Sequence, residues 1–282
     1  MSGISLYYSS STDAGIVKTV NQDSIFIRVG KNKYSTYGVF AVADGMGGLS
    51  HGEVASRMTC DALNVWWEEY LPDILKSNSN SNSKKLFEHL EISLQELFNK
   101  VNSEIYCYAS QTGEKAGTTL TVLFIYNSEF LIKHIGDSRI YRIGKEVVQL
   151  TCDHTWVAYQ VISGNITPKE ARNHPKRNIL TQCLGVFTEL DIYTKKGIIE
   201  NRDVFLICSD GFYDKLMDND LLKGVVLLRE NPSYGDELAG DLISYVKRRG
   251  ERDNISLIMV YPQSSCFAKI LLERIKGILK RR

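Results

Sequence analysis

The chain has 282 residues, 43% of them hydrophobic and 24% charged, which is enough apolar material for one large buried core. Its 34 basic and 33 acidic side chains leave a formal net charge of +1, so the overall charge does not indicate a nucleic-acid-binding protein or a protein held on an anionic membrane. No apolar run approaches the roughly 18 residues that a membrane-spanning helix needs.

The N-terminal segment and the cysteines both indicate a cytoplasmic protein. The segment MSGISLYYSSSTD lacks the basic and apolar regions of a signal peptide. The six cysteines are widely separated and form no CxxC pair, which fits free thiols in a reducing compartment. We therefore expect a cytoplasmic protein, and we expect it to be a monomer.

Two strands and two long helices are predicted in the first third of the chain. The runs SIFIRV from Ser24 and GVFAVAD from Gly38 have the character of paired strands joined by a hairpin-length turn. Apolar residues at helical spacing predict a helix over residues 53–71 and another over residues 84–113. The polar stretch SNSNSNS from Ser77 separates them and is typical of a solvated linker.

Strand-like runs dominate the rest of the chain: TTLTVLFIY, EFLIKHIG, SRIYRIG, DVFLICS and NISLIMVY. A helix is predicted from Asp153, and two more between Asn219 and Arg249. Because consecutive hairpins outnumber strand-helix-strand units, the pattern favours antiparallel sheet with helices on its outer faces. We find no internal repeat and no flexible linker, so we predict one domain over residues 1–262 and a separate C-terminal helix over residues 263–282.

The predicted C-terminal helix, FAKILLERIKGILKRR, is basic and amphipathic. Its apolar residues, such as Phe267 and Leu271, fall on one helical face, and Lys269 and Lys276 fall on the other. Such a helix can bind a membrane surface or a partner, but it more often docks on its own domain. We favour docking and keep membrane contact as the less favoured alternative.

Five aspartates share one context, because each stands at the end of an apolar strand run. They are Asp23, Asp44, Asp137, Asp210 and Asp253. Carboxylates that converge on one buried rim repel one another unless cations neutralise them. Oxygen ligands suit Mg²⁺ or Mn²⁺, and the lack of clustered histidine or cysteine argues against zinc. Taken singly, each could instead be a helix cap or a turn residue.

Eight short motifs in this order resemble the metal-dependent (type 2C) serine/threonine protein phosphatases, in particular their bacterial branch. The motifs are NQDS from Asn21, ADGMGG from Ala43 with GEVAS from Gly52, GTTLT from Gly117, GDSRIYR from Gly136, LTCDHT from Leu150, NILTQCLG from Asn178, CSDGFYD from Cys208 and RDNISLIMV from Arg252. The resemblance covers about residues 5–262. It implies an α+β fold, a four-layer α/β/β/α sandwich of two antiparallel sheets flanked by helices.

The resemblance also implies roles for the aspartates. Asp44 would bridge two metal ions, with the Gly45 carbonyl on the second and with Asp210 and Asp253 completing the first. Asp23 would hold a metal-bound water, and Asp137 together with Asp210 would match a third-metal site. The expected cofactors are Mn²⁺ or Mg²⁺, two per site with a third position beside them. A water activated by the metal ions would attack phosphorus, so Ser209 is expected to be structural.

The phosphate-binding position departs from the family. An arginine usually stands five residues before the aspartate of the NQD motif, and Lys18 occupies that position here. Lysine keeps the positive charge but loses the two-pronged geometry, which predicts weaker phosphate binding, unless Lys18 is an ordinary solvated lysine. Met46 follows the DG dipeptide where many animal relatives have histidine, and we expect His51 and His134 to be bystanders.

The stretch from Asp153 to Gly185 resembles the flap beside the active site of bacterial members. Its basic residues could meet an acidic phosphopeptide, or they could simply be solvated. The basic residues are Lys169, Arg172, Lys176 and Arg177.

The resulting hypothesis is a phosphatase that reverses the action of a serine/threonine kinase pathway on phosphorylated proteins. One alternative is a weakly active pseudo-phosphatase that binds a phosphorylated partner as a regulatory module, an option that the Lys18 departure keeps open. Another is a phosphatase of nucleotides or other small molecules, since the chemistry at phosphorus would be the same. We do not expect nucleic acid to be a partner.

Overall fold

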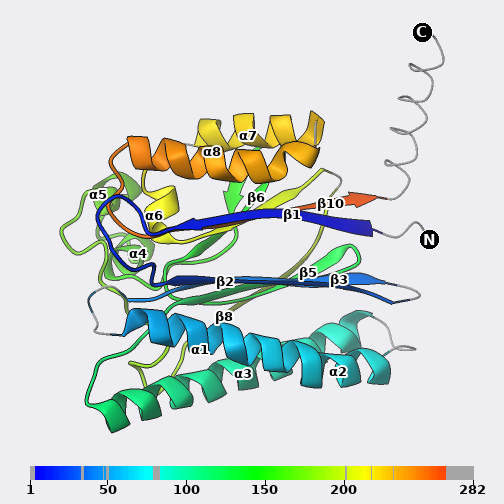
Figure 1. Cartoon of the computed structure of the whole chain (residues 1–282), viewed down its shortest axis with the longest axis horizontal. Coiled ribbons are helices and arrows are strands. Elements are labelled where there is room, and N and C mark those ends of the chain that lie inside the picture. Colours follow the sequence, from blue (N-terminus) through cyan, green and yellow to red (C-terminus); the bar gives the residue numbers. More distant parts are fainter. Residues whose placement is uncertain are drawn as a thin grey trace.

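The computed structural model describes residues 4–32, 35–46, 48, 51–78, 83–200, 202–216, 218–230 and 232–264. Two five-stranded antiparallel sheets lie face to face (Figure 1). The first sheet has the strand order β1 (Ile4–Asp13), β10 (Ile255–Ser264), β9 (Val204–Cys208), β6 (Arg139–Ile143) and β7 (Val147–Gln149). The second has the order β2 (Asp23–Lys31), β3 (Thr36–Asp44), β4 (Leu120–Tyr126), β5 (Glu129–Ile135) and β8 (Tyr193–Ile198).

Helices cover the outer face of each sheet (Figure 1). Helices α1 (Gly52–Val65), α2 (Leu71–Ser77) and α3 (Ser83–Thr112) lie on the second sheet, and α7 (Asp218–Glu230) and α8 (Gly235–Arg248) lie on the first. A short 3-10 turn, Pro232–Tyr234, precedes α8. The predicted four-layer α/β/β/α sandwich is therefore confirmed.

The apolar core has three parts because each sheet is buried on both of its faces. The part between the sheets includes Phe40 and Leu123 from the second sheet, with Phe205 and Ile258 from the first. The other two parts lie between each sheet and its helices. Strands buried on both faces explain the continuous apolar runs from which the strands were predicted.

Three short helices lie at one end of the sandwich: α4 (Trp156–Ile162), α5 (Pro168–Arg172) and α6 (Asp210–Tyr213). One helix was predicted in the flap, the stretch from Asp153 to Gly185, and the structure has two there, α4 and α5. Each begins at a threonine whose side chain accepts a backbone N–H, Thr155 for α4 and Thr167 for α5, so each has its own start signal.

The helix predicted over residues 53–71 is also corrected. It passes through a π-helical turn, Trp66–Tyr70, and continues as α2 to Ser77. Pro72 stands in the first turn of α2, where no intrahelical N–H is required, so it does not end the helical path.

Strands β1, β7 and β8 were not predicted, and β10 runs to Ser264, two residues beyond the predicted domain boundary. The C-terminal helix predicted over residues 263–282 lies almost wholly outside the described residues, as does the middle of the SNSNSNS linker. In the described part of the chain no helix is both long and apolar enough to cross a membrane. The five cysteines among the described residues are free thiols, as expected.

Candidate active site

Two of the predicted aspartates are neighbours at the end of the second sheet. Asp23 begins β2, Asp44 ends β3, and the two are partners across the antiparallel ladder. The backbone of Asp44 is held by two threonines of the GTTLT motif. Its N–H donates to Thr119 Oγ1 at 3.0 Å, and its carbonyl accepts from Thr118 Oγ1 at 2.9 Å. This motif therefore fixes the position from which the Asp44 carboxylate projects.

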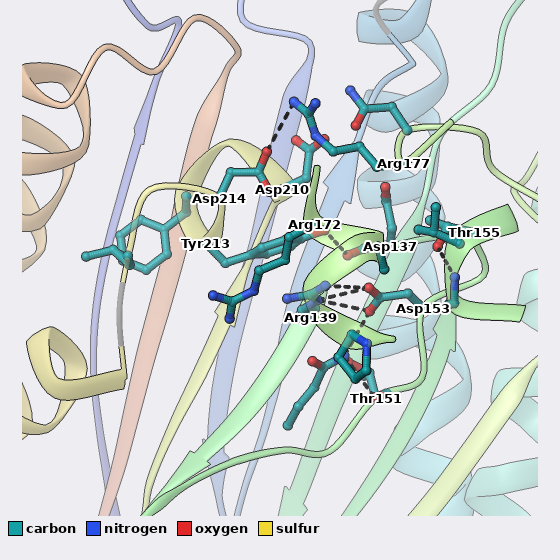
Figure 2. A pocket seen from close by; sticks show the side chains of 18 of the residues that line it. Asp137, Arg139, Thr151, Asp153, Thr155, Arg172, Arg177, Asp210, Tyr213 and Asp214 are labelled. Carbon is teal, nitrogen blue, oxygen red and sulfur yellow. Dashed lines mark hydrogen bonds and ion pairs between the residues drawn. The ribbon is translucent and has the colours of Figure 1, made fainter. Parts of the chain in front are cut away.

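The other three aspartates lie at the matching end of the first sheet. Asp137 is in the turn between β5 and β6, Asp210 follows β9 and begins α6, and Asp253 precedes β10. Asp137 and Asp210 line one cavity of about 780 Å³, and Figure 2 shows both at this pocket. Asp210 and Asp253 line an adjoining pocket of about 330 Å³. The structure thus brings the strand-end aspartates to one rim.

The carboxylates of this rim raise one another's pKa. Burial raises the pKa of Asp44 well above its ordinary value, and the charges of Asp23, Asp210, Asp137 and Asp253 raise it further. Burial raises the pKa of Asp210 in the same way, with Asp137 and Asp253 as the strongest neighbouring charges. Burial raises the pKa of Asp137 to about 7. Without cations, ionising the whole group would be costly.

Only one of the two carboxylate oxygens of Asp23 has a hydrogen-bond partner among the described atoms. Its Oδ2 accepts a hydrogen bond from Ser209 Oγ at 2.9 Å, and Ser209 Oγ accepts the Ser256 N–H at 3.0 Å. Its Oδ1 is buried without a hydrogen-bond partner among the described atoms. Burial raises the Asp23 pKa to about 6. Ser209 is buried and holds one oxygen of the Asp23 carboxylate, and the unpartnered Asp23 oxygen fits a site that receives a cation or its water.

The donor chemistry fits hard, hydrated cations. Within the described ranges, no three acidic, histidine or cysteine side chains close around one point as a complete ligand set. Mg²⁺ commonly keeps several waters and takes only one or two carboxylates from a protein. The carboxylate oxygens that line this rim are the donors that Mg²⁺ and Mn²⁺ prefer.

Gly45 stands where a side chain would not fit. A Cβ added there would lie 2.4 Å from the Gly52 carbonyl oxygen and 2.5 Å from that of Gln22. The Gly45 N–H also donates to the Gln22 carbonyl at 3.1 Å. The backbone after Asp44 is therefore packed against two other segments, and any contribution of Gly45 to the site must come from its main chain.

Lys18 lies at the site, as the resemblance implied. Its ammonium nitrogen is 3.3 Å from Asp253 Oδ1, and its side chain is 34% exposed. It lines the smaller pocket together with Asp210 and Arg177. A positive charge that is accessible and adjoins the aspartates is suitably placed for an anionic phosphate, which argues against an ordinary solvated lysine.

The flap forms one wall of the larger cavity (Figure 2). Arg172 and Arg177 line that cavity, and Arg177 is 3.7 Å from Asp214 Oδ2. Lys176 instead lies over the ring of Trp156, with its ammonium 4.8 Å from the ring centroid. Lys169 is on the exposed helix α5 and does not line the cavity. The four basic residues thus divide into two that face the cavity and two that do not.

The two histidines expected to be bystanders lie away from both cavities. His134 is fully buried in the second sheet, where its Nδ1 is 2.8 Å from Thr121 Oγ1. His51 is 3.6 Å from Glu53. Met46 donates its N–H to the Gly117 carbonyl at 3.0 Å. None of these side chains is placed as a proton donor to the site.

The sequence did not single out an ion pair that lines the larger cavity. The Arg139 guanidinium binds both carboxylate oxygens of Asp153, the shortest contact being 2.6 Å, and lies 3.7 Å from the centroid of the Tyr213 ring. Tyr213 in turn donates its hydroxyl to the Asp137 carbonyl at 3.2 Å. The three residues lie in motifs quoted above, but spacing alone does not show that those motifs meet.

Comparison with known proteins identifies the family. The family model described as "Protein phosphatase 2C" matches residues 16–230. The chain belongs to the protein phosphatase 2C family. A serine/threonine phosphatase of Listeria innocua is 31% identical over 252 residues, 88% of this chain and 93% of the relative.

Solved structures agree with this membership. The crystal structure of serine/threonine phosphatase Stp1 from Staphylococcus aureus superimposes with a TM-score of 0.77 at 27% identity, covering 92% of this chain and 96% of that one. The catalytic domain of the phosphatase PstP in complex with two manganese ions gives a TM-score of 0.70 at 29% identity, over 92% and 99%. The chain is a protein serine/threonine phosphatase of the bacterial type, with phosphoproteins as its substrate class.

Proposed function

We propose that this phosphatase hydrolyses phosphoserine and phosphothreonine with Mn²⁺ or Mg²⁺ ions held on the aspartate rim. The observation that carries the proposal is the meeting of strand-end carboxylates at one rim, where Asp23 pairs with Asp44 across the ladder and Asp210 lines both pockets. Burial raises the pKa of Asp44, and the charges of four other aspartates raise it further. Cations relieve such repulsion. The two manganese ions named for the PstP catalytic domain support the same class of ion.

Each donor has a distinct place in the proposed centre. Asp44 would lie between two ions, with the Gly45 carbonyl on one of them and Asp210 and Asp253 on the other. Asp23 would accept a hydrogen bond from a coordinated water through its unpartnered oxygen. Asp137 and Asp210, which line the same cavity, would form a third-metal position.

When bound, a pair of divalent ions lowers the pKa of a shared water toward neutrality and neutralises phosphate oxygens. The residues of the chain orient these partners. Lys18 attracts the phosphate by its charge, and Ser209 keeps Asp23 in one orientation. Burial raises the pKa of the Cys183 thiol to about 12 and raises that of Cys208, so neither cysteine supplies a thiolate nucleophile.

The larger cavity suggests how a phosphoprotein would bind. It extends from the aspartates to the flap, and Arg172 and Arg177 lie on its wall. We infer that a phosphoprotein segment follows this cavity and that the substrates come from a serine/threonine kinase pathway. A cavity of about 780 Å³ is also within the size range of small-molecule sites, so competition with a nucleotide separates the two substrate classes.

The test is metal-dependent phosphate release from a phosphothreonine peptide, with a nucleotide as competitor. We expect hydrolysis with Mn²⁺, none after chelation, and none with Asp44→Asn. Peptide binding without hydrolysis would favour the pseudo-phosphatase, and strong inhibition by the nucleotide would favour a small-molecule substrate. Activity that persists in Asp44→Asn would overturn the assigned centre.

A further inference from the structure

The loop that carries Lys18 has little apolar packing to hold it. This loop, residues 14–22 and here called the lysine loop, joins β1 to β2. Its three large apolar side chains are exposed: Ile16 by 56%, Val17 by 50% and Val20 by 52%. Since these side chains bury little surface, hydrophobic burial contributes little to the position of the loop. Polar contacts must therefore determine where Lys18 lies.

One buried side chain supplies such contacts at both ends of the loop. Asn254, which is 4% exposed, accepts the Gln22 N–H through Oδ1 at 2.9 Å. Its Nδ2 donates to the Ala14 carbonyl at 3.0 Å and to the Val20 carbonyl at 3.1 Å. The amide thus uses its acceptor and both donor positions on the lysine loop.

The same residue is joined to the metal-site rim. Asn254 follows Asp253, and its N–H donates to Asp253 Oδ1 at 2.9 Å. The lysine loop also packs tightly on this backbone, because a Cβ at Gly15 would lie 2.3 Å from the Asp253 carbonyl oxygen. A short connection through Asn254 therefore links the lysine loop to Asp253, whose Oδ1 lies 3.3 Å from the Lys18 ammonium.

We propose that Asn254 is a positioning residue for phosphate binding, which it controls by holding the lysine loop so that Lys18 stands beside Asp253. Asn254 does not itself touch the substrate. Because its amide is neutral, replacing Asn254 with alanine does not change the charge of the rim. The inference rests on the proposed function, in which Lys18 binds the substrate phosphate.

The expected signature is a loss of phosphate affinity with little change in turnover. In Asn254→Ala, we expect the KM for a phosphothreonine peptide and the Ki of inorganic phosphate to rise by roughly tenfold, the change that follows from weakening one charge-assisted hydrogen bond. The kcat should change much less, because Thr118 and Thr119 hold the backbone of Asp44 independently of Asn254. Hydrogen exchange of residues 14–22 should become faster.

A double-mutant cycle distinguishes this role from general destabilisation. If Asn254 acts through Lys18, adding Asn254→Ala to Lys18→Ala should raise the phosphate Ki little further. A matched control is Asn102, a 7% exposed asparagine that binds the backbone at Gly185 and Phe187. Asn102→Ala removes the same kind of contact elsewhere and should leave the phosphate Ki unchanged.

Fully additive effects of the two substitutions, or a loss of kcat at unchanged KM, would overturn the proposal. If Asn254→Ala does not fold, Asn254→Ser serves in its place, since one hydroxyl cannot bind both loop carbonyls.

Phosphate binding to the Mn²⁺-loaded protein is measured by calorimetry as well as by inhibition. A wild type that binds phosphate but hydrolyses no peptide would refute the proposed function and still test Asn254.

Discussion

The buried histidine His134 makes the fold sensitive to acid. Its Nδ1 is 2.8 Å from Thr121 Oγ1, its Nε2 is 3.2 Å from the Cys152 carbonyl oxygen, and its ring stacks on that of His154 at 5.2 Å between centroids. The pKa of His134 is lowered from 6.5 to about 3, first by burial and then by the charges of His154 and Arg139. We therefore expect the folded protein to keep this imidazole neutral in mild acid.

The sign and size of the effect follow from linkage. Between pH 6.5 and pH 3 the unfolded chain binds a proton at His134 that the folded protein does not, so the free energy of unfolding falls as the pH falls. At pH 5 the loss is about 2 kcal/mol, since one pKa unit corresponds to about 1.4 kcal/mol. Above pH 6.5 the His134 imidazole is neutral in both the folded and the unfolded protein, so it no longer contributes to the pH dependence of stability.

Urea unfolding of the wild type and of His134→Asn at pH 8, 7, 6 and 5 measures this loss. The variant loses contacts and is expected to be less stable at pH 8, but its stability should fall less steeply. Contributions from the aspartate rim are common to both proteins and cancel in the difference. If the two stability curves ran parallel from pH 8 to pH 5, the reasoning about His134 would be refuted.

Three further predictions concern the site and its supports. Gly45→Ala would bring a Cβ within 2.4 Å of the Gly52 carbonyl oxygen, so we expect a loss of several kcal/mol in thermal unfolding and weak Mn²⁺ binding by calorimetry. Lys18→Ala should raise the KM for a phosphopeptide, whereas Lys18→Arg should lower it, because arginine can bind phosphate with two parallel hydrogen bonds. The Lys247 ammonium lies 2.8 Å from Asp13 and lowers the pKa of that carboxyl, so Asp13→Asn should cost about 0.2–1 kcal/mol at pH 7. This difference from the wild type should shrink as acid protonates Asp13, which urea unfolding at pH 7 and pH 3 would show.

The sequence predicted those parts of the fold that have a strong local signal. The buried strands β3, β4, β5 and β9 are rich in apolar residues, and the aspartates were recognisable from their place at the ends of such runs. Which of these aspartates would share a metal ion was implied by the resemblance to the phosphatase family. The candidate site was therefore accessible from the sequence.

Strand β1 had no such signal. Five of its ten residues are serine or threonine. It pairs with β10 along its whole length, from Asp13 opposite Ile255 to Ile4 opposite Ser264. An edge strand of this composition depends on a contact between the two ends of the chain, which no local pattern contains. The π-helical turn is a similar case, since Trp66 there donates to Ser93 of α3 at 2.8 Å.

The contacts that support the site could not be predicted from the sequence either. Asn254 meets the lysine loop across more than 230 positions of sequence, and Ser209 meets Asp23 across 186. Both residues stand next to aspartates that the sequence did identify. Their partners became visible only when the ends of the two sheets were brought together.

The central claim is that carboxylates at one end of the sandwich hold the ions on which hydrolysis depends. Strand β9 offers a matched pair, because Asp210 follows one end of it in the site and Asp203, 4% exposed, precedes the other end outside the site. The decisive measurement is Mn²⁺-dependent phosphate release from a phosphothreonine peptide by Asp210→Asn and Asp203→Asn. We predict that Asp210→Asn abolishes release while Asp203→Asn retains it. Equal activity of the two variants would contradict the assignment of the metal centre.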